Sequence, residues 1–198
     1  GGSLGTPSSA EARAADGTAT LRVGSVFPSS SLDPSKMRSN SDIAYLAPLY
    51  DRLLQMDKDL KISPMLAESF EWAADRKSMT LKLREGVKFH DGGDFDAQSV
   101  KANLEAKKAA GSPVVLAAVS AIESIEVVDP HTVVLHVAAG KGADLPLNLA
   151  EGAGFIVSPD GLKSGALETK PQGSGPYTLS GVKAGQSVSY VKSDSYWD

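Results

Sequence analysis

The pattern that decides the fold runs from Met79 to Val100 and reads MTLKLREGVKFHDGGDFDAQSV. It begins with apolar residues at Met79, Leu81 and Leu83 that alternate with polar residues. Successive side chains of a strand point to opposite faces, so this alternation predicts a strand with one buried face.

Two turns and a helix are expected after this strand. The turns lie at residues 85–86 and 91–93, where an acidic residue precedes glycine. Asp96 stands where an N-cap belongs, because its short side chain can accept a hydrogen bond from the free N–H groups of a first helical turn. The run AQSVKANLEAKKAA at residues 97–110 is a good helix former, and it stops at Gly111-Ser112-Pro113.

A calcium loop is the alternative interpretation of the acidic residues in this stretch. Asp94, Asp96 and Gln98 offer oxygen atoms at alternate positions, and Glu105 stands where such a loop places its bidentate glutamate. However, Ser99 occupies the position that requires glycine, and a helix after Asp96 would separate the oxygen atoms. We therefore expect no metal site here.

Outside this stretch the pattern indicates a mixed α/β or α+β chain with more strand than helix. A strand is expected around Leu21 and Val23, a hairpin turns at Asp129-Pro130, and two strands joined around residues 183–186 end the chain. One further helix is expected, capped by Ser41-Asp42 and kinked or delayed by Pro48. Its apolar face would carry Ile43, Leu46, Leu49, Tyr50, Leu53 and Leu54.

Composition excludes several classes of function. The net charge is −4 and the pI is near 5.4, so the basic charge of a nucleic-acid-binding protein is lacking. The absence of cysteine excludes disulfides, thiolate nucleophiles and cysteine metal sites. No apolar run approaches the roughly 20 residues that span a bilayer. Residues 1–18 are small and polar, and we expect them to form a flexible N-terminal tether.

The segment KPQGSGPYTL at residues 170–179 could be a phosphate loop or a nucleophile on a tight turn. A phosphate loop needs a lysine and a hydroxyl residue before a helix, and a nucleophile elbow needs glycine two residues either side of the serine. Ser174 has adjacent glycines and a strand pattern after it, so both interpretations fail. Gly173 and Gly175 can take positive φ, and Pro176 favours extended geometry at Gly175, so we expect a stiff bend.

The histidines give no catalytic constellation. His90 and Asp91 could form half of a catalytic pair, but spacing marks no serine or cysteine partner for them. An aspartate before glycine more often folds its own turn through hydrogen bonds from its side chain to the backbone. We therefore expect no catalytic residues, and the chain is not interpreted as an enzyme.

Four segments, in order, resemble the extracytoplasmic solute-binding proteins of ABC importers, in the oligopeptide-, dipeptide- and nickel-binding family (family 5). They cover nearly everything after Thr18, and their joint order is highly specific. They are SLDP (Ser31 to Pro34) with APLYDRLL and SPMLAESFEW after it, the stretch Met79 to Val100, the hairpin VVDPHTVVL, and PQGSGPY with the closing SDSYWD.

This resemblance implies a partial type II periplasmic-binding-protein-like fold. Residues 19–46 and 155–198 are expected to form part of lobe I, and residues 47–154 an inserted domain of that lobe. Members of the family are much longer than this chain, so the C-terminal second lobe is expected to be missing. A cleft that closes two lobes around its ligand loses about half of its contacts with one lobe, so we expect weak binding at most.

The function implied by the resemblance is that of a substrate-binding receptor for an ABC transporter. It would bind a peptide or a related small solute, without a cofactor, and deliver it to an ABC permease in the membrane. The expected place is extracytoplasmic, as a periplasmic protein or a cell-surface lipoprotein held by the tether. No nucleic-acid partner is expected.

The resemblance also suggests which segments face the ligand. The first is the loop after the first strand, with Phe27, Pro28, Ser29 and Ser30. The others are Ser112 to Val114, after the capped helix, and Asn148 to Glu151. Loops of small polar residues are often only solvated, so this is the competing interpretation of all three segments.

Two other functions stay open from the sequence. One is a stand-alone hydrolase that uses His90 and Asp91 with an unmarked nucleophile. The other is a partner-binding module that kept the lobe without a role in transport.

Overall fold

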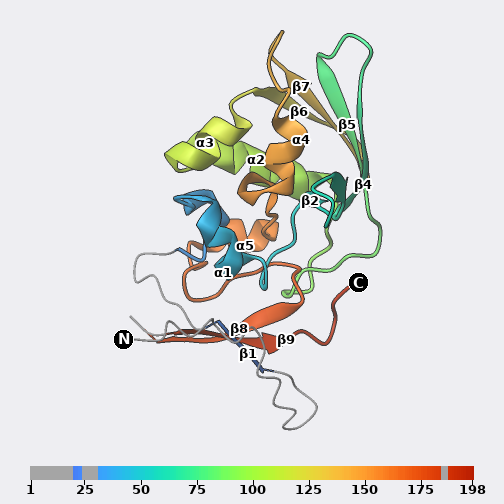
Figure 1. Ribbon diagram of the computed structural model, residues 1–198. Coiled ribbons are helices and arrows are strands. Elements are labelled where there is room, and N and C mark those ends of the chain that lie inside the picture. Colours follow the sequence, from blue (N-terminus) through green and yellow to red (C-terminus); the bar gives the residue numbers. More distant parts are fainter. Residues whose placement is uncertain (1–19, 24–30, 184–186) are drawn as a thin grey trace.

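The computed structural model describes residues 20–23, 31–183 and 187–198. The expected tether at residues 1–18 lies outside this part of the chain, and so do four expected ligand contacts, Phe27, Pro28, Ser29 and Ser30. Figure 1 shows two groups of elements arranged along the long axis, one around β4–β7 and the other around β1, β8 and β9.

The elements follow each other in mixed order. The strands are β1 (Thr20–Val23), β2 (Leu54–Met56), β3 (Ile62–Pro64), β4 (Ala67–Trp72), β5 (Ser78–Leu83), β6 (Ile122–Asp129), β7 (Thr132–Val137), β8 (Tyr177–Lys183) and β9 (Ser187–Lys192). The α-helices are α1 (Ile43–Leu46), α2 (Ala97–Ala110), α3 (Pro113–Val119), α4 (Leu145–Ala150) and α5 (Pro159–Ser164). Short 3-10 helices are η1 (Pro34–Lys36), η2 (Asn40–Asp42) and η3 (Gly152–Gly154).

An antiparallel sheet with strand order β4-β5-β7-β6 carries the larger core. The apolar side chains of β5 are buried, and pairing with β7 places Leu81 opposite Val133. β6 and β7 form the hairpin expected at Asp129-Pro130. α2 contributes Val100 and Leu104 to the same apolar cluster, which confirms the strand and the helix predicted from the opening stretch.

The start of α2 shows which partners the acidic residues of this stretch bind. The Asp96 side chain accepts from Ser99 N over 3.1 Å, and Asp96 N donates back to Ser99 Oγ, so the two residues form a capping box. Asp94 pairs with Lys88, and Glu105 with Lys101. In the residues that the structure describes, no cluster of histidine and acidic side chains could hold a metal ion.

A second antiparallel sheet, with strand order β1-β9-β8, lies at the opposite end of the molecule from β4–β7 (Figure 1). Tyr190 of β9 is buried, and its hydroxyl donates to Tyr45 O over 2.8 Å. Tyr45, Tyr50 and Tyr190 belong to one apolar cluster, which is distinct from the cluster under β4–β7. These two sheets therefore have separate cores, and the two-stranded β2-β3 sheet packs on the larger one.

The prediction of a long helix after Ser41-Asp42 is wrong. A short 3-10 turn leads into α1, which ends at Leu46, two residues before Pro48. Proline has no N–H to continue the helix. The chain instead extends, and Arg52 forms an isolated bridge with Phe155. The apolar residues that suggested one helical face are largely buried, but they are shared between the two cores.

A buried polar stripe on α2 holds residues 153–157, where the chain leaves η3 and becomes extended. Asn103 Nδ2 donates to Val157 O, and its Oδ1 accepts from Val157 N. Lys107 Nζ donates to Ala153 O over 2.9 Å and also to Phe155 O. The other edge of the segment pairs with the chain around residues 51–53. The helix thus occupies the place of a neighbouring strand for this segment.

Burial of Lys107 predicts a dependence of stability on pH. It lowers the pKa of this side chain to about 7 from its ordinary value of 10.5. The folded state therefore holds the proton less tightly than the unfolded state, so the free energy of unfolding should rise by about 2 kcal/mol between about pH 7 and about pH 9. Urea unfolding at several pH values measures this rise.

The matched variants for that measurement are Lys107→Met and Lys108→Met. Lys107→Met should flatten the rise, because it removes the titrating group. Lys108→Met should retain it, because Lys108 lies on the half-buried side of α2 and donates to Ile122 O. An equal pH profile for the parent chain and Lys107→Met would contradict the prediction.

The bend around Ser174 is stiff for a different reason from the one expected. Neither Gly173 nor Gly175 has positive φ. Gly175 instead lies against the backbone at Leu49, and its N–H donates to Leu49 O over 2.9 Å. His90 completes the contact, because its Nε2 lies 2.8 Å from Gly175 O. The glycines are therefore needed for close approach of two backbone segments.

Candidate functional site

A hollow of about 280 Å³ lies where the segment from η1 to η2 meets α3 and the end of α4. It brings together three of the expected ligand contacts: Val114, Asn148 and Glu151. The other expected residue, Ser112, lies beside it rather than in its lining. The complete lining is Met37, Asn40, Val114, Val115, Ala117, Ala118, Asn148, Glu151, Gly152 and Ala153.

Ser112 sets the direction of α3 at the edge of the hollow. Its Oγ donates to Met37 O and accepts from Val115 N, so it caps α3 and ties the helix to the loop after η1. Its own N–H donates to Ser35 O over 2.8 Å. Pro113 at the first helical position suits this sharp start. As a result Val115 is buried while Val114 keeps 42% of its surface exposed.

The end of α4 places two of the three polar side chains of the hollow, Asn148 and Glu151. Asn148 Nδ2 donates to Ala118 O over 3.0 Å, which fixes α4 against α3. Glu151 follows the helix in extended geometry, and its carboxylate accepts from Asn40 Nδ2. Gly152 comes next, packed against the thioether of the buried Met37, and leaves no room for a side chain.

The charge of the lining is negative, because Glu151 is its one ionisable residue within the described chain. Arg52 does not belong to the lining but binds the end of α4, because its Nη1 donates to Ala150 O over 3.0 Å. Burial lowers the pKa of Arg52, and the charges of Asp51 and Glu151 oppose that shift. No ion pair joins Arg52 to Glu151 among the described residues.

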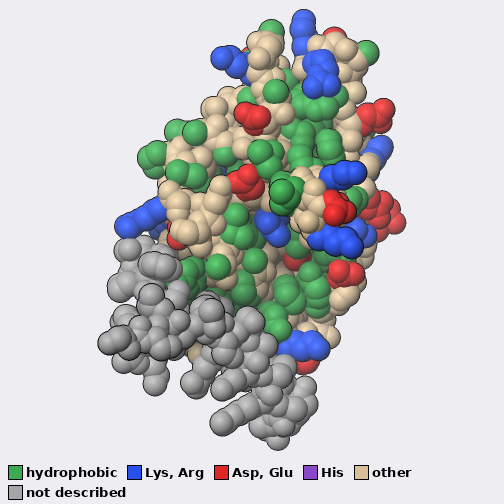
Figure 2. Space-filling view, viewed as in Figure 1, with side chains coloured by type: hydrophobic (Ala, Val, Ile, Leu, Met, Phe, Trp, Pro, Cys, Tyr) green, Lys and Arg blue, Asp and Glu red, His purple; other side chains and the backbone are tan. Residues whose placement is uncertain are grey.

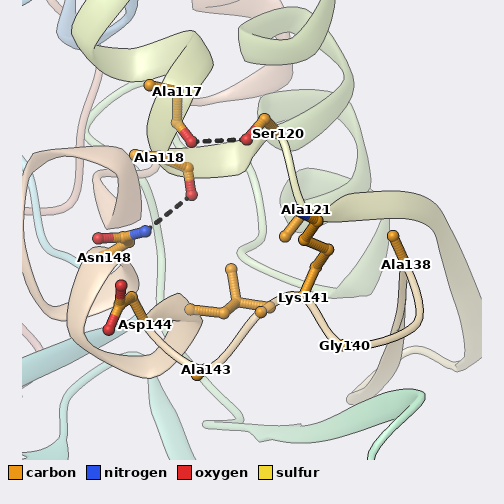
Figure 3. A pocket seen from close by; sticks show the side chains of 12 residues that line it. Ala117, Ala118, Ser120, Ala121, Ala138, Gly140, Lys141, Ala143, Asp144 and Asn148 are labelled. Carbon is orange, nitrogen blue, oxygen red and sulfur yellow. Dashed lines mark hydrogen bonds between the residues drawn. The ribbon is translucent and has the colours of Figure 1, made fainter.

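A second hollow of about 480 Å³ adjoins the first and shares Ala117, Ala118 and Asn148 with it. Figure 3 shows Asn148 with its amide nitrogen on the Ala118 carbonyl and its amide oxygen directed the opposite way. Lys141 and Asp144 also line this hollow. Asn148 therefore stands between the two hollows and is accessible to a ligand in either.

The surface over α3 is apolar. Val114 and Leu116 are among the large hydrophobic side chains that stay exposed, and Figure 2 shows hydrophobic side chains gathered over this helix. A ligand that lay along α3 would contact small and branched apolar groups there.

His90 and Asp91 serve the fold. Asp91 Oδ1 accepts from Gly93 N, which is the turn expected for an aspartate before glycine. Its Oδ2 accepts from Ser158 Oγ over 2.5 Å. His90 N donates to Gly173 O, and burial lowers the pKa of the His90 ring. The side chains of His90 and Asp91 thus contact the bend and the start of α5, and neither lies in the two hollows.

Seven of the ten lining residues were not among those expected, and two of them, Met37 and Asn40, come from a segment that was not expected to contribute. They lie in a short polar stretch without periodicity, so no local signal marks them. Contacts far apart in the sequence place them, such as the Asn40 amide on Glu151. In the described part of the chain, no helix is both long enough and apolar enough to pass through a membrane.

Comparison with known proteins shows which family this sequence matches. A family model described as bacterial extracellular solute-binding proteins, family 5 Middle, matches residues 61–198. The chain is 35% identical over 182 residues to the glutathione-binding protein GsiB of Salmonella paratyphi A (strain ATCC 9150 / SARB42). That match covers 89% of this chain and 35% of the relative.

Solved structures give the same result. The binding protein AgaA of A. tumefacien R10, in complex with agropinic acid, has a TM-score of 0.74 at 31% identity and is matched over 85% of this chain and 35% of its own. The dipeptide-binding protein of Pseudoalteromonas sp. SM9913, in complex with Met-Leu, has a TM-score of 0.74 at 25% identity. That match covers 85% of this chain and 38% of the dipeptide-binding protein. The chain therefore shares the mixed α/β fold of these periplasmic binding proteins over about a third of their length.

Proposed function

Since the chain belongs to the bacterial extracellular solute-binding proteins of family 5, we propose that it is part of the substrate-binding receptor of an ABC importer. The observation that carries this proposal is the meeting of Val114, Asn148 and Glu151 in one hollow. They come from two segments far apart in sequence. A concave surface with a few polar groups among apolar ones is the usual form of a small-molecule site.

The proposed ligand is a peptide or a related small solute. One relative is named for glutathione, and a structural neighbour holds the dipeptide Met-Leu. Both ligands offer amide and charged groups that Asn148 and Glu151 could bind, with apolar parts that fit Val114. An ABC permease in the membrane is the proposed partner, to which the receptor would deliver the solute.

We propose the same division into lobes that the sequence resemblance implied. Residues 19–46 and 155–198 would belong to lobe I, and residues 47–154 to its inserted domain. The separate sheets support this division, since β4 to β7 fall within the second range and β1, β8 and β9 within the first. The hollow lies near the junction, because Met37 and Asn40 come from the first range and the rest of its lining from the second.

The receptor is proposed to work outside the cytoplasmic membrane, as the description of its family indicates. A lipid anchor at the N-terminal side, with residues 1–18 as its tether, would hold the receptor near its importer. A periplasmic protein without an anchor is the alternative.

Weak binding at the hollow is the expected result for the 198-residue chain. The hollow is open on one side, so a ligand gains only part of the contacts that a closed cleft provides. Titration with glutathione and with Met-Leu, followed by NMR, should give millimolar dissociation constants. The amide signals that move should be those of Val114, Asn148 and Glu151.

The controls for this titration test the place of binding. Asn148→Ala should reduce the shifts, because it removes a polar group of the lining. Gln55→Ala is the matched variant and should leave them unchanged, because Gln55 belongs to β2 and does not line the hollow. Shifts confined to other residues, or none at millimolar peptide, would refute the proposed site. Micromolar affinity would refute the expectation of an incomplete cleft.

A further inference from the structure

Three cationic side chains gather around a third hollow, at the end of the molecule away from β1, β8 and β9. Arg76 and Lys77 come from the turn between β4 and β5, and Lys141 comes from the loop between β7 and α4. Figure 2 shows lysine and arginine side chains gathered at this end. The third hollow has a volume of about 220 Å³ and shares no residue with the first hollow, so it is separate from the proposed solute site.

The charge of the third hollow favours an anion. Among the described residues, the side chains of Arg76, Lys77 and Lys141 have no ion-pair or hydrogen-bond partner. Asp75 is the carboxylate of the lining, and its Oδ1 accepts from Lys77 N over 3.0 Å, which shapes the turn. Three positive charges and one negative charge give the lining a formal charge of +2, so an anion there meets an opposite charge.

The Arg76 guanidinium is held in place by Trp72. Its central carbon lies 5.1 Å from the centre of the Trp72 ring, which is a cation–π contact. Trp72 is itself packed against the larger core, so the fold sets the position of the guanidinium. A planar guanidinium that stacks on a ring keeps its N–H groups at its edges, where two of them can bind two oxygen atoms of one anion.

The backbone at Arg76 is unfavourable for an arginine. Arg76 has a φ of 60°, and in the described part of the chain only one other non-glycine residue has a positive φ. Glycine would adopt this conformation at lower cost. The turn is nevertheless well held, because Arg76 N donates to Ala73 O over 2.9 Å and Lys77 O accepts from Val137 N over 3.0 Å. Arg76 thus costs stability without forming an ion pair in the fold, which is typical of a residue kept for a ligand.

We propose that the third hollow binds a phosphate group, with the Arg76 guanidinium on two of its oxygen atoms and Lys77 and Lys141 as further positive charges. Its volume is below the range of about 300–1,000 Å³ that is usual for drug-sized ligands, so a single small anionic group fits it best. Lys141 lines both the second and the third hollow, and its flexible stem lets the ammonium turn to the anion. Free phosphate and the headgroup of an anionic phospholipid share this chemistry, and the experiment separates the two sources.

NMR titration with inorganic phosphate, at constant ionic strength set by chloride, tests the site. The amide signals of Arg76, Lys77 and Lys141 should move and saturate. Arg76→Gly should weaken this binding at least about tenfold, since it removes a charged hydrogen-bond donor. The same variant should raise the melting temperature, because glycine relieves the positive φ, so lost binding cannot result from lost folding. Asp75→Asn should tighten the binding, because it removes the like charge and keeps the acceptor for Lys77 N.

Co-sedimentation with vesicles tests the lipid source. Vesicles of phosphatidylglycerol should be compared with vesicles of the zwitterionic phosphatidylcholine, for the parent chain and for Arg76→Gly. Binding to phosphatidylglycerol alone that Arg76→Gly abolishes would assign the phosphate group to a lipid headgroup. Saturable shifts with inorganic phosphate and no binding to either vesicle would assign it to free phosphate. Both results support the proposed site.

Lys58→Gln is the matched control. It removes an exposed cation from the turn between β2 and β3, which does not line the third hollow. Phosphate and vesicle binding should be unchanged in this variant. An equal loss in Lys58→Gln and Arg76→Gly would show unspecific attraction and overturn the proposal. The absence of both kinds of binding, or binding that Arg76→Gly leaves unchanged, would overturn it too, and none of these results affects the proposed receptor function.

Discussion

The Gly175→Val substitution is expected to prevent stable folding of the chain. A Cβ at this position would lie 2.5 Å from the carbonyl carbon of Leu49, 2.6 Å from Pro48 O and 2.7 Å from Tyr50 N. All three are backbone atoms, so rotation of a neighbouring side chain cannot relieve the overlap. Separation of the two segments would also break the hydrogen bonds from Gly175 N and from Tyr177 N.

The expected loss is about 4 kcal/mol or more, which is a large part of the stability of a domain of this size. Urea unfolding followed by circular dichroism measures it, together with the yield of soluble protein. Gly181→Ala is the matched control, because Gly181 lies exposed in β8 and a Cβ there would meet nothing within 4 Å. A Gly175→Val protein with the stability of the parent would show that the contact at Leu49 can open without cost.

The same bend shows what the sequence could and could not predict. The pattern of glycine and proline identified a stiff turn, and spacing excluded a phosphate loop and a nucleophile elbow. The reason for the glycines was not local, however, because it lies in the backbone at Leu49, far away in the chain. Local rules for positive φ could not find it.

The strand, capping box and helix from Met79 onward were predictable because each depends on neighbours in sequence. The segment after α1 was not, because burial there serves two cores and not one helical face. For the site, family resemblance indicated Val114, Asn148 and Glu151, and the structure brings them together. Asn40 needed the tertiary contact to Glu151, which no sequence pattern encodes.

A buried carboxylate joins the bend to the end of the chain. Asp51 has no exposed surface, and its Oδ2 accepts from Ser174 Oγ over 3.0 Å and from Trp197 Nε1 over 2.5 Å. Its Oδ1 accepts from the Tyr196 hydroxyl over 3.1 Å. Burial raises the pKa of Asp51, although the three hydrogen bonds oppose this shift. Tyr196 and Trp197, near the C-terminus, therefore have a structural role, as a clamp on Asp51.

Asp51→Ala is expected to lower the free energy of unfolding by about 3 kcal/mol or more, because it leaves three donors without their acceptor and opens a cavity. Asp51→Asn should cost much less. Its amide oxygen can accept from Trp197 and Ser174, while its amide nitrogen donates to the Tyr196 oxygen, since a hydroxyl can exchange the two roles.

Urea unfolding compares the two Asp51 variants, and fluorescence in a Trp72→Phe background reports on Trp197 alone, since the chain has two tryptophans. A red-shifted emission in Asp51→Ala, but not in Asp51→Asn, would show that the clamp has opened.

The raised pKa of Asp51 also predicts a dependence of stability on pH. The folded state binds the proton of the Asp51 carboxyl group more tightly than the unfolded state does. Ionisation of Asp51 therefore destabilises the fold as the pH rises through its range, and Asp51→Asn should lack that contribution. Equal losses in the two variants would mean that packing around Asp51, and not acceptance of the three hydrogen bonds, holds the C-terminal segment in place.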